Sequence, residues 1–145
     1  SGNLSSIEIN DSFADALDFD TSFINIDSIL IKNASNDCID LSSGNYNFNY
    51  IKANKCGDKG VSIGEKSNVQ ITKLDINNSN IGVSSKDYSF TKIINANIFD
   101  SMFCLESKQK KQEYGGSKLL VNNLTCPNKV FFDEKSVLKV GNIEF

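Results

Sequence analysis

Several residue types that support common enzyme chemistry are missing from this 145-residue chain. It contains no histidine, arginine or tryptophan, and only one proline and one methionine. Without histidine there is no imidazole general base, no Ser–His or Cys–His nucleophile pair and no histidine-ligated metal. Without arginine the bidentate group that recognises phosphate and guanine is missing, so we expect no nucleic-acid partner. Only Asp, Glu, Lys, Tyr, Cys and Ser remain for chemistry.

Long apolar segments and strong net charge are also missing. No run of about 18 apolar residues occurs, so we expect no membrane insertion, and the start lacks a signal-peptide pattern. The net charge is only −3. The length fits one domain over residues 1–145. The opening Ser1-Gly2-Asn3 indicates a piece of a longer protein with neighbouring domains, and we favour an extracellular or cell-envelope location.

A pattern that returns every 22 residues organises the chain. Its five copies begin at Asp15, Asp37, Lys59, Ile81 and Phe103. Each copy alternates apolar and polar residues, as a short strand with one buried face does, and a second alternating run precedes it. Two or three short strands in 22 residues make one coil of a parallel β-helix. The sequence therefore predicts an all-β fold, a single-stranded right-handed parallel β-helix (solenoid) of about six coils.

Stacking the copies predicts columns of equivalent residues. A small column contains Ala16, Cys38, Gly60, Gly82 and Cys104. An inward apolar column contains Leu17, Ile39, Val61, Val83 and Leu105. A second small column, at a tight corner, contains Ala34, Cys56, Ser79, Ser101 and Cys126. Small side chains suit a corner because it leaves little volume inside.

The last third of the chain departs from this period. Residues 107–116 are longer than a plain corner needs, which predicts a loop excursion, and residues 137–145 predict a partial coil. Neither end has an amphipathic capping helix. A β-helix with bare ends exposes strand edges, so we expect either neighbouring domains over them or end-to-end self-association.

The four cysteines permit disulfides. Cys38 and Cys104 lie three coils apart, roughly 14 Å at strand spacing, which is too far for a bond. Cys38 and Cys56 are close enough to pair across one corner. We interpret all four as free thiols that act as small buried residues. A zinc site is not expected, since paired CxxC spacing and histidine are both missing.

Acidic residues recur on the first two copies. Asp18 and Asp20 lie beside Asp40, and Asp15 lies one coil from Asp37, so carboxylates stack about 4.8 Å apart and repel. Such a stack binds a cation, shares a proton or stays solvated. Asp18, Asp20 and Asp40 are a candidate Ca²⁺ site, the one cofactor we consider. Asp15, Asp37, Asp18 and Asp40 are the alternative acids for glycoside hydrolysis, and a solvated face is the third interpretation.

Lysines gather around the loop excursion. Lys86 and Lys108 occupy adjacent coils, and Lys110, Lys111 and Tyr114 project from the loop. A basic groove with a tyrosine suits an acidic polysaccharide, through charge and contact of sugar C–H groups with the ring. A solvated corner is the plainer interpretation. Tyr46, Tyr50 and Tyr88 are further candidate sugar platforms, although Tyr46 falls on the inward pattern.

Two stretches resemble polygalacturonases of the pectin-lyase-like β-helix group. They are residues 36–41 (Asn-Asp-Cys-Ile-Asp-Leu) and residues 56–64 (Cys-Gly-Asp-Lys-Gly-Val-Ser-Ile-Gly). The resemblance implies a carbohydrate-active enzyme that cleaves polyuronates. However, the family's proton-donor Asp is Asn36 here, its His is Lys59, and its Arg-Ile-Lys substrate clamp has no counterpart.

More of the chain resembles β-helix regions of bacterial surface or secreted proteins that stand beside CotH-type and lamin-tail modules. The similar stretches are residues 16–20, 57–67, 80–87 and 109–115. The resemblance implies a noncatalytic module that binds polysaccharide or serves as a rigid spacer. We favour this function over an enzyme, because the histidine, the arginine and the acid at Asn36 are missing.

Overall fold

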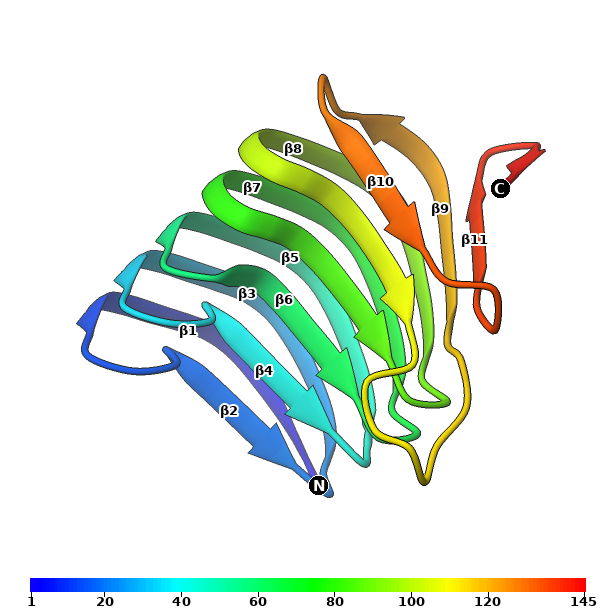
Figure 1. Ribbon diagram of the computed structural model, residues 1–145. Helices are drawn as coiled ribbons and strands as arrows, with labels where there is room; N and C mark the ends of the chain where they lie inside the picture. The colour runs from blue at the N-terminus through cyan, green and yellow to red at the C-terminus, as the bar shows by residue number, and fades with distance from the viewer.

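The computed structural model describes residues 1–145 and consists of β-strands wound into a right-handed coil (Figure 1). The strands are β1 (Gly2–Ser12), β2 (Leu17–Asp20), β3 (Phe23–Ala34), β4 (Ile39–Ser42), β5 (Asn45–Cys56), β6 (Lys59–Gly64), β7 (Asn68–Lys86), β8 (Phe90–Lys108), β9 (Lys118–Thr125), β10 (Lys129–Phe132), β11 (Val137–Val140) and β12 (Ile143–Glu144). The predicted β-solenoid of about six turns is confirmed. No helix long and apolar enough to cross a membrane is found.

Two parallel sheets form the walls of the solenoid. The back sheet runs in the order β1-β3-β5-β7-β8-β9-β11, and the front sheet runs β2-β4-β6, then the second parts of β7 and β8, then β10 (Figure 1). Every pair is parallel except the short β11–β12 pair. Partners lie 22 residues apart in most coils, as in Ile7↔Ile29 and Leu17↔Ile39. The register becomes 23 between Asn45 and Asn68, because the turn before β7 contains one more residue.

The core lies between the two sheets and is built from the predicted apolar column. Ile39, Val61, Val83 and Leu105 are in register and fully buried. Ile, Val and Leu from the back sheet fill the other side, and 27 buried residues form one continuous cluster. β-Branched side chains suit these strands because they pack well on a pleated surface. The period-2 pattern therefore sets both the strands and the core.

A column of residues with positive φ turns the back sheet towards the front sheet. It consists of Asp11, Asn33, Lys55, Asn78 and Asp100, with φ between 51° and 67°. Asn and Asp tolerate this left-handed conformation better than most residues. The side chains also link coils, since Asn33 Nδ2 donates to Asp11 Oδ1 at 2.7 Å. This column recurs once per coil, every 22 or 23 residues, and was not recognised from the sequence.

The end of the chain follows the predictions. Residues 109–117 leave β8 as a loop, and its backbone is held by Asp87, whose Oδ1 accepts bonds from Lys110 N and Lys111 N. After β9, the chain crosses to the front sheet as β10 and returns as β11, which lies parallel to β9. The antiparallel strand β12 then closes the back sheet.

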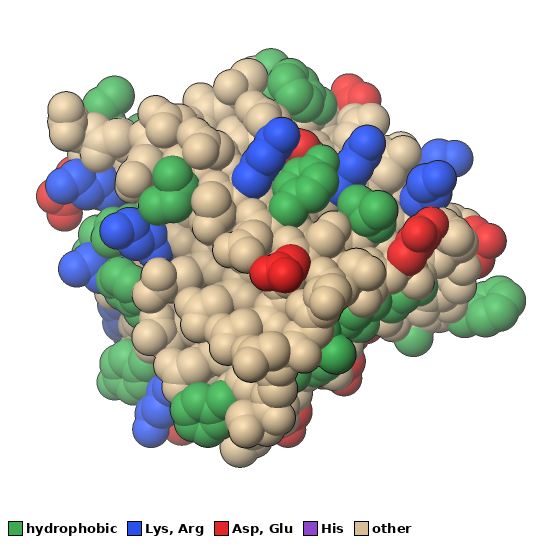
Figure 2. Space-filling view, turned by 180° about the vertical axis from the view of Figure 1, so that it is seen from behind, with side chains coloured by type: hydrophobic (Ala, Val, Ile, Leu, Met, Phe, Trp, Pro, Cys, Tyr) green, Lys and Arg blue, Asp and Glu red, His purple; other side chains and the backbone are tan.

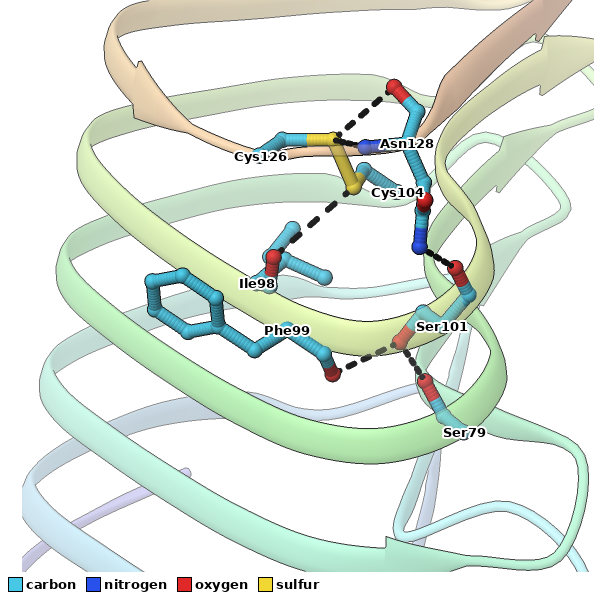
Figure 3. Close-up of a disulfide and its surroundings, with 7 residues drawn as sticks. All are labelled: Ser79, Ile98, Phe99, Ser101, Cys104, Cys126 and Asn128. Atoms are coloured by element: carbon cyan, nitrogen blue, oxygen red, sulfur yellow. Dashed lines mark hydrogen bonds between the residues drawn. A yellow bond between two sulfur atoms is a disulfide. The ribbon is translucent and has the colours of Figure 1, made fainter.

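The free-thiol interpretation of the cysteines is wrong. Cys38 is bonded to Cys56 and Cys104 to Cys126, with Cα–Cα distances of 5.3 and 6.3 Å. Each disulfide joins the end of a back-sheet strand to a front-sheet strand, as Figure 3 shows for the second one. The pairing of Cys38 with Cys56 across one corner is the one that the sequence left open. The pairing of Cys104 with Cys126 was not predicted.

The position predicted for Cys126 is wrong as well. The corner column contains Ala34 and Cys56 in register, and Ser79 and Ser101, whose hydroxyls are 2.7 Å apart. Cys126 instead follows Thr125, which pairs with Asn97. The cysteine thus lies at the level of Ile98, before the corner, because the loop excursion lengthens the last full coil from 22 to 28 residues.

Candidate functional site

The predicted acidic residues form a hydrogen-bonded ladder at the start of the front sheet. Asp15 Oδ1 accepts bonds from Asp37 N at 2.9 Å and from Asn36 Nδ2 at 2.7 Å. Asp37 Oδ1 in turn accepts a bond from Lys59 N at 2.9 Å, and Lys59 Nζ lies 3.9 Å from the same oxygen. Each carboxylate therefore satisfies a backbone N–H of the next coil, a role that stabilises stacking.

Three carboxylates of this region converge. Oxygens of Asp15, Asp37 and Asp40 lie within 4.8 Å of one another. Burial raises the pKa of Asp37, and burial with the neighbouring Asp40 raises the pKa of Asp18. Hydrogen bonds from Ser42 and Thr21 lower the pKa of Asp20, which accepts from Ser42 Oγ at 2.8 Å.

The converging trio differs from the predicted Ca²⁺ set of Asp18, Asp20 and Asp40. All three members of the trio belong to the alternative catalytic acids, and Asp40 alone also belongs to the predicted Ca²⁺ set. Acids in close contact bind a cation or share a proton. Calcium binding and catalysis at these residues stay predictions.

Lys86 and Lys108 are in register on adjacent coils but turn to different partners. Lys86 is buried, and its Nζ donates to Ser62 Oγ at 2.7 Å with no carboxylate within 4.0 Å. Burial lowers the pKa of Lys86. Lys108 Nζ pairs with Glu106 at 2.8 Å, and Glu106 also accepts a bond from Ser84. The two ammonium groups therefore do not form one open basic groove.

The loop residues come together at a separate place. Lys111 forms an ion pair with Glu65, and the Tyr114 ring meets Tyr88 edge to face at a centroid distance of 6.1 Å. A hollow of about 360 Å³ beside them is lined by Ser43, Gly44, Asn45, Glu65, Lys66 and Tyr114. Lys111 and Tyr114 are thus neighbours, Lys110 is exposed beside them, and Lys86 is buried elsewhere. Ligand binding by this predicted set stays a prediction.

A further candidate site lies on the outside of the back sheet. Two adjoining hollows, of about 590 and 420 Å³, share Lys52 and Asn54 and together form what we call the back groove. Its remaining lining residues are Glu8, Asn10, Leu30, Ile31, Lys32, Tyr50, Ala53, Asp75, Ile76, Asn77, Asn97 and Phe99. The groove crosses successive coils from β1 to β8, so it runs along the solenoid axis.

A fixed network stands at the centre of the back groove. Tyr50 Oη donates to Asp75 Oδ2 at 2.9 Å, and Asn97 Nδ2 donates to Asp75 Oδ1 at 2.9 Å. Lys73 Nζ lies 5.2 Å from the Tyr50 ring centroid and 3.8 Å from Asp75. Burial, followed by Asp75, raises the pKa of Tyr50. The tyrosine ring is therefore held in one orientation at the groove wall.

Lysines at the groove remain without acidic partners. Neither Lys32 nor Lys52 has a carboxylate within 4.0 Å. Figure 2 shows the back face with lysine, acidic and hydrophobic side chains separated by uncharged polar ones, so no single charge sign dominates. The groove therefore offers ammonium groups, side-chain amides and aromatic rings to one ligand.

Of the three tyrosines considered as sugar platforms, Tyr50 belongs to this groove and Tyr46 is buried as its pattern predicts. Tyr88 is exposed beside the loop. The other groove residues were missed because an alternating pattern shows which side chains point outward but not where the outer surface is hollow. Comparison of the chain with models of known protein families, with curated proteins and with solved structures finds no match.

Proposed function

We propose that this β-solenoid is a noncatalytic module that binds polysaccharide along the back groove. The observation that carries the proposal is the groove itself, an elongated hollow across several coils with polar and aromatic walls. An extended polymer fits a groove that runs along the axis, while a compact ligand would need an enclosed pocket. The solenoid supplies rigid spacing between neighbouring domains at the same time.

The chemistry of the groove walls suits sugar rings. Asn54, Asn77 and Asn97 provide amide donors and acceptors for hydroxyl groups. Tyr50 and Phe99 offer ring surface for sugar C–H groups, and Phe99 is 45% exposed. Lys32 and Lys52 are free to pair with acidic groups of a glycan.

The setting of the module follows from the same features. The two disulfides support an oxidising compartment, which agrees with a cell envelope or a secreted protein. The solenoid fold supports the resemblance of the sequence to pectin-lyase-like β-helix regions of bacterial surface proteins. We therefore propose that the module belongs to a larger protein of this kind.

A carbohydrate-active enzyme is the second candidate, because Asp15, Asp37 and Asp40 converge and Asp37 has a raised pKa. We favour the binding module, since Asp15 and Asp37 are already bonded to backbone N–H groups. The presence of Asn36 where polygalacturonases have their proton-donor Asp also favours the binding module. Release of reducing sugar or unsaturated product from polyuronates, lost in Asp37→Asn, would support the enzyme instead.

The test is a binding titration against a panel of neutral and acidic polysaccharides, by calorimetry or thermal shift. Tyr50→Ala and Phe99→Ala are each expected to weaken binding by about 0.5–1.5 kcal/mol, the value of one aromatic contact. Met102→Ala is the matched control, because Met102 is exposed and lies outside the groove. A loss in Tyr114→Ala with none in Tyr50→Ala would move the site to the loop. Binding to no glycan would leave only the spacer function.

A further inference from the structure

The charged side chains of the back groove are unevenly distributed along the solenoid axis. The middle of the groove is β5, whose Lys52 and Asn54 line both hollows. Lys32 lines the groove on the preceding strand β3, where it is in register with Asn54. Both lysines are exposed, and neither has a carboxylate within 4.0 Å. Two neighbouring coils therefore offer unpaired ammonium groups at the centre of the groove.

The groove has no lysine on either side of this centre. Towards the N-terminus its charged lining residue is Glu8 on β1, which is exposed and has no ammonium group within 4.0 Å. Towards the C-terminus its polar lining residues are Asp75 and Asn77 on β7 and Asn97 on β8. The cationic centre is therefore flanked by a carboxylate on each side and by amides beyond it.

Asp75 has partners other than the central lysines, although Lys52 is in register with it. Its Oδ2 accepts a bond from Tyr50 Oη, its Oδ1 accepts one from Asn97 Nδ2, and Lys73 Nζ lies 3.8 Å from Oδ2. Lys73 itself does not line the groove. Because these donors hold the carboxylate, Lys52 stays unpaired, and the groove offers no ammonium group at β7 for a further acidic group of a ligand.

The spacing of the coils determines which sugars meet these groups. Neighbouring strands lie about 4.8 Å apart, which is close to the length of one sugar unit in an extended chain. A polysaccharide along the groove therefore places roughly one sugar on each coil from β1 to β8. An acidic sugar at β3 or β5 meets an ammonium group, while one at β1 meets Glu8 and one at β7 meets Asp75. Attraction at the centre and repulsion on both sides disfavour a polymer with an acid on every sugar.

We propose that the ligand of the back groove is a polysaccharide in which acidic sugars are separated by neutral ones. The acidic sugar binds at Lys32 and Lys52. Neutral sugars bind the amides of Asn77 and Asn97 and pack on the exposed ring of Phe99. The inference rests on the proposed function, because it names the class of glycan that the same groove takes. A lysine binds carboxylate and sulfate alike as a point charge, so the shared chemistry is a singly charged acidic group.

The first experiment varies the charge density on one polymer backbone at a time. Polygalacturonate and polyglucuronate with none, about half or all of their carboxyl groups methyl-esterified are titrated into the protein by calorimetry, at low salt so that charges are weakly screened. Dextran with sulfate on all, about half or none of its sugars is the parallel series. The half-charged form is expected to bind about threefold or more tighter than the fully charged and uncharged forms, since exposed charge pairs separate them. The series that binds identifies the acidic group.

The outcomes separate this inference from the proposed function. A fully charged or an uncharged polymer that binds as tightly as the half-charged form would overturn the inference and leave the proposed function standing. Binding of none of these polymers would overturn the inference. If the wider panel of neutral and acidic polysaccharides also gave no binding, the proposed function would fail with it.

Two variants test the assignment of charges to the coils. Asn77→Lys adds an ammonium group at β7, and should raise the affinity for the fully charged polymer about two- to fivefold, the value of one exposed ion pair. Lys32→Gln/Lys52→Gln removes both central ammonium groups, and should abolish the preference for the half-charged over the uncharged polymer. No change in either variant would overturn the role of these residues.

Matched controls make the same change of net charge outside the groove. Met102→Lys alters a side chain that is 69% exposed and does not line the groove, and should leave every affinity unchanged. Lys129→Gln/Lys139→Gln is the control for the double variant, since both lysines are exposed and lie outside the groove. Thermal melting should confirm that all variants fold. A gain in Met102→Lys equal to that in Asn77→Lys would indicate a general effect of charge and would overturn the assignment to the groove.

Discussion

The front and back sheets of this solenoid use polar residues differently. On the front sheet the charged groups are bonded to one another, as in Glu106 with Lys108, or to the backbone, as in Asp37 with Lys59 N. On the back sheet Lys32 and Lys52 have no acidic partner and line a hollow. Polar side chains in register that bond to one another stabilise the stack. Polar side chains that have no such partner remain available for a ligand.

The largest expected effect on stability comes from removing a disulfide that links the two sheets. Cys38→Ala/Cys56→Ala and Cys104→Ala/Cys126→Ala each remove a disulfide between a back strand and a front strand. Each pair should lower the free energy of unfolding by about 3 kcal/mol, the value for loops of about 20 residues. Urea unfolding at pH 7 measures the loss, and reduction of the wild type should reproduce it. A loss below about 1 kcal/mol would show that the sheets hold together without the disulfides.

Removal of a bonded front-face carboxylate should cost less. Asp37→Ala leaves Lys59 N without its acceptor and Lys59 Nζ without one of its two acidic neighbours. The expected loss is about 1–3 kcal/mol in urea unfolding, as for other buried groups that lose a hydrogen-bond partner. Binding of a glycan in the back groove should not change. A loss of binding in Asp37→Ala with normal stability would contradict the assignment of ligand binding to the back sheet alone.

The matched substitution Asp37→Asn keeps an acceptor oxygen and removes the charge. The folded state raises the pKa of Asp37 above 3.8, so it binds this proton more tightly than the unfolded chain does. The contribution of Asp37 to stability is therefore fully present below pH 3.8 and is lost as the pH rises through the raised pKa. Asp37→Asn should be at least as stable as the wild type at pH 7, and this relative gain should vanish at pH 3. Urea midpoints at the two pH values measure it.

A smaller effect of opposite sign is expected at Lys86, a buried ammonium bonded to Ser62 but to no carboxylate. Lys86→Met should stabilise the protein by about 1 kcal/mol at pH 7, because an apolar side chain of similar length avoids the cost of burying the charge. The pKa of Lys86 is lowered from 10.5, so this cost is full below the lowered pKa and disappears as the pH approaches 10.5. Destabilisation at pH 7 would mean that the bond to Ser62 outweighs burial.

The smallest effect on stability is expected in the back groove. Lys52→Gln removes a charge that has no partner, so the free energy of unfolding should change by less than about 0.5 kcal/mol. Affinity for an acidic glycan should fall, and the dependence of binding on salt should weaken. Calorimetry at two salt concentrations measures both. A change in stability as large as that of Asp37→Ala would remove the distinction between the faces.

Much of the fold followed from residues alone. The column of Ile39, Val61, Val83 and Leu105 predicted both the 22-residue coil and its core, because parallel stacking places equivalent residues together. Asn33 and Asn78 carried a further signal for the corners, since residues with positive φ recur at each corner and Asn tolerates this conformation. The pairing of Cys104 with Cys126 could not be predicted in this way, because the loop excursion moves Cys126 out of the corner column.

The candidate site was less predictable. Outward positions were recognised, but the pattern does not say how a long side chain bends. Lys86 turns back to Ser62 on the preceding coil, and its side chain passes over Gly64. Tyr50 and Phe99 lie on different coils and line the two adjoining hollows of one groove. An alternating pattern gives the outward direction of each side chain but not the shape of the surface between them.

The disulfides also determine how the chain responds to mechanical force. Each bond closes a loop within about one coil, with sequence separations of 18 and 22 residues. When the termini are pulled apart, these loops cannot extend, and at about 3.5 Å per residue they withhold roughly 60 and 75 Å of contour length. Single-molecule stretching of the oxidised protein should therefore stop about 135 Å short of the reduced protein. As a tether between neighbouring domains, the solenoid would have a limit on its extension that depends on the redox state.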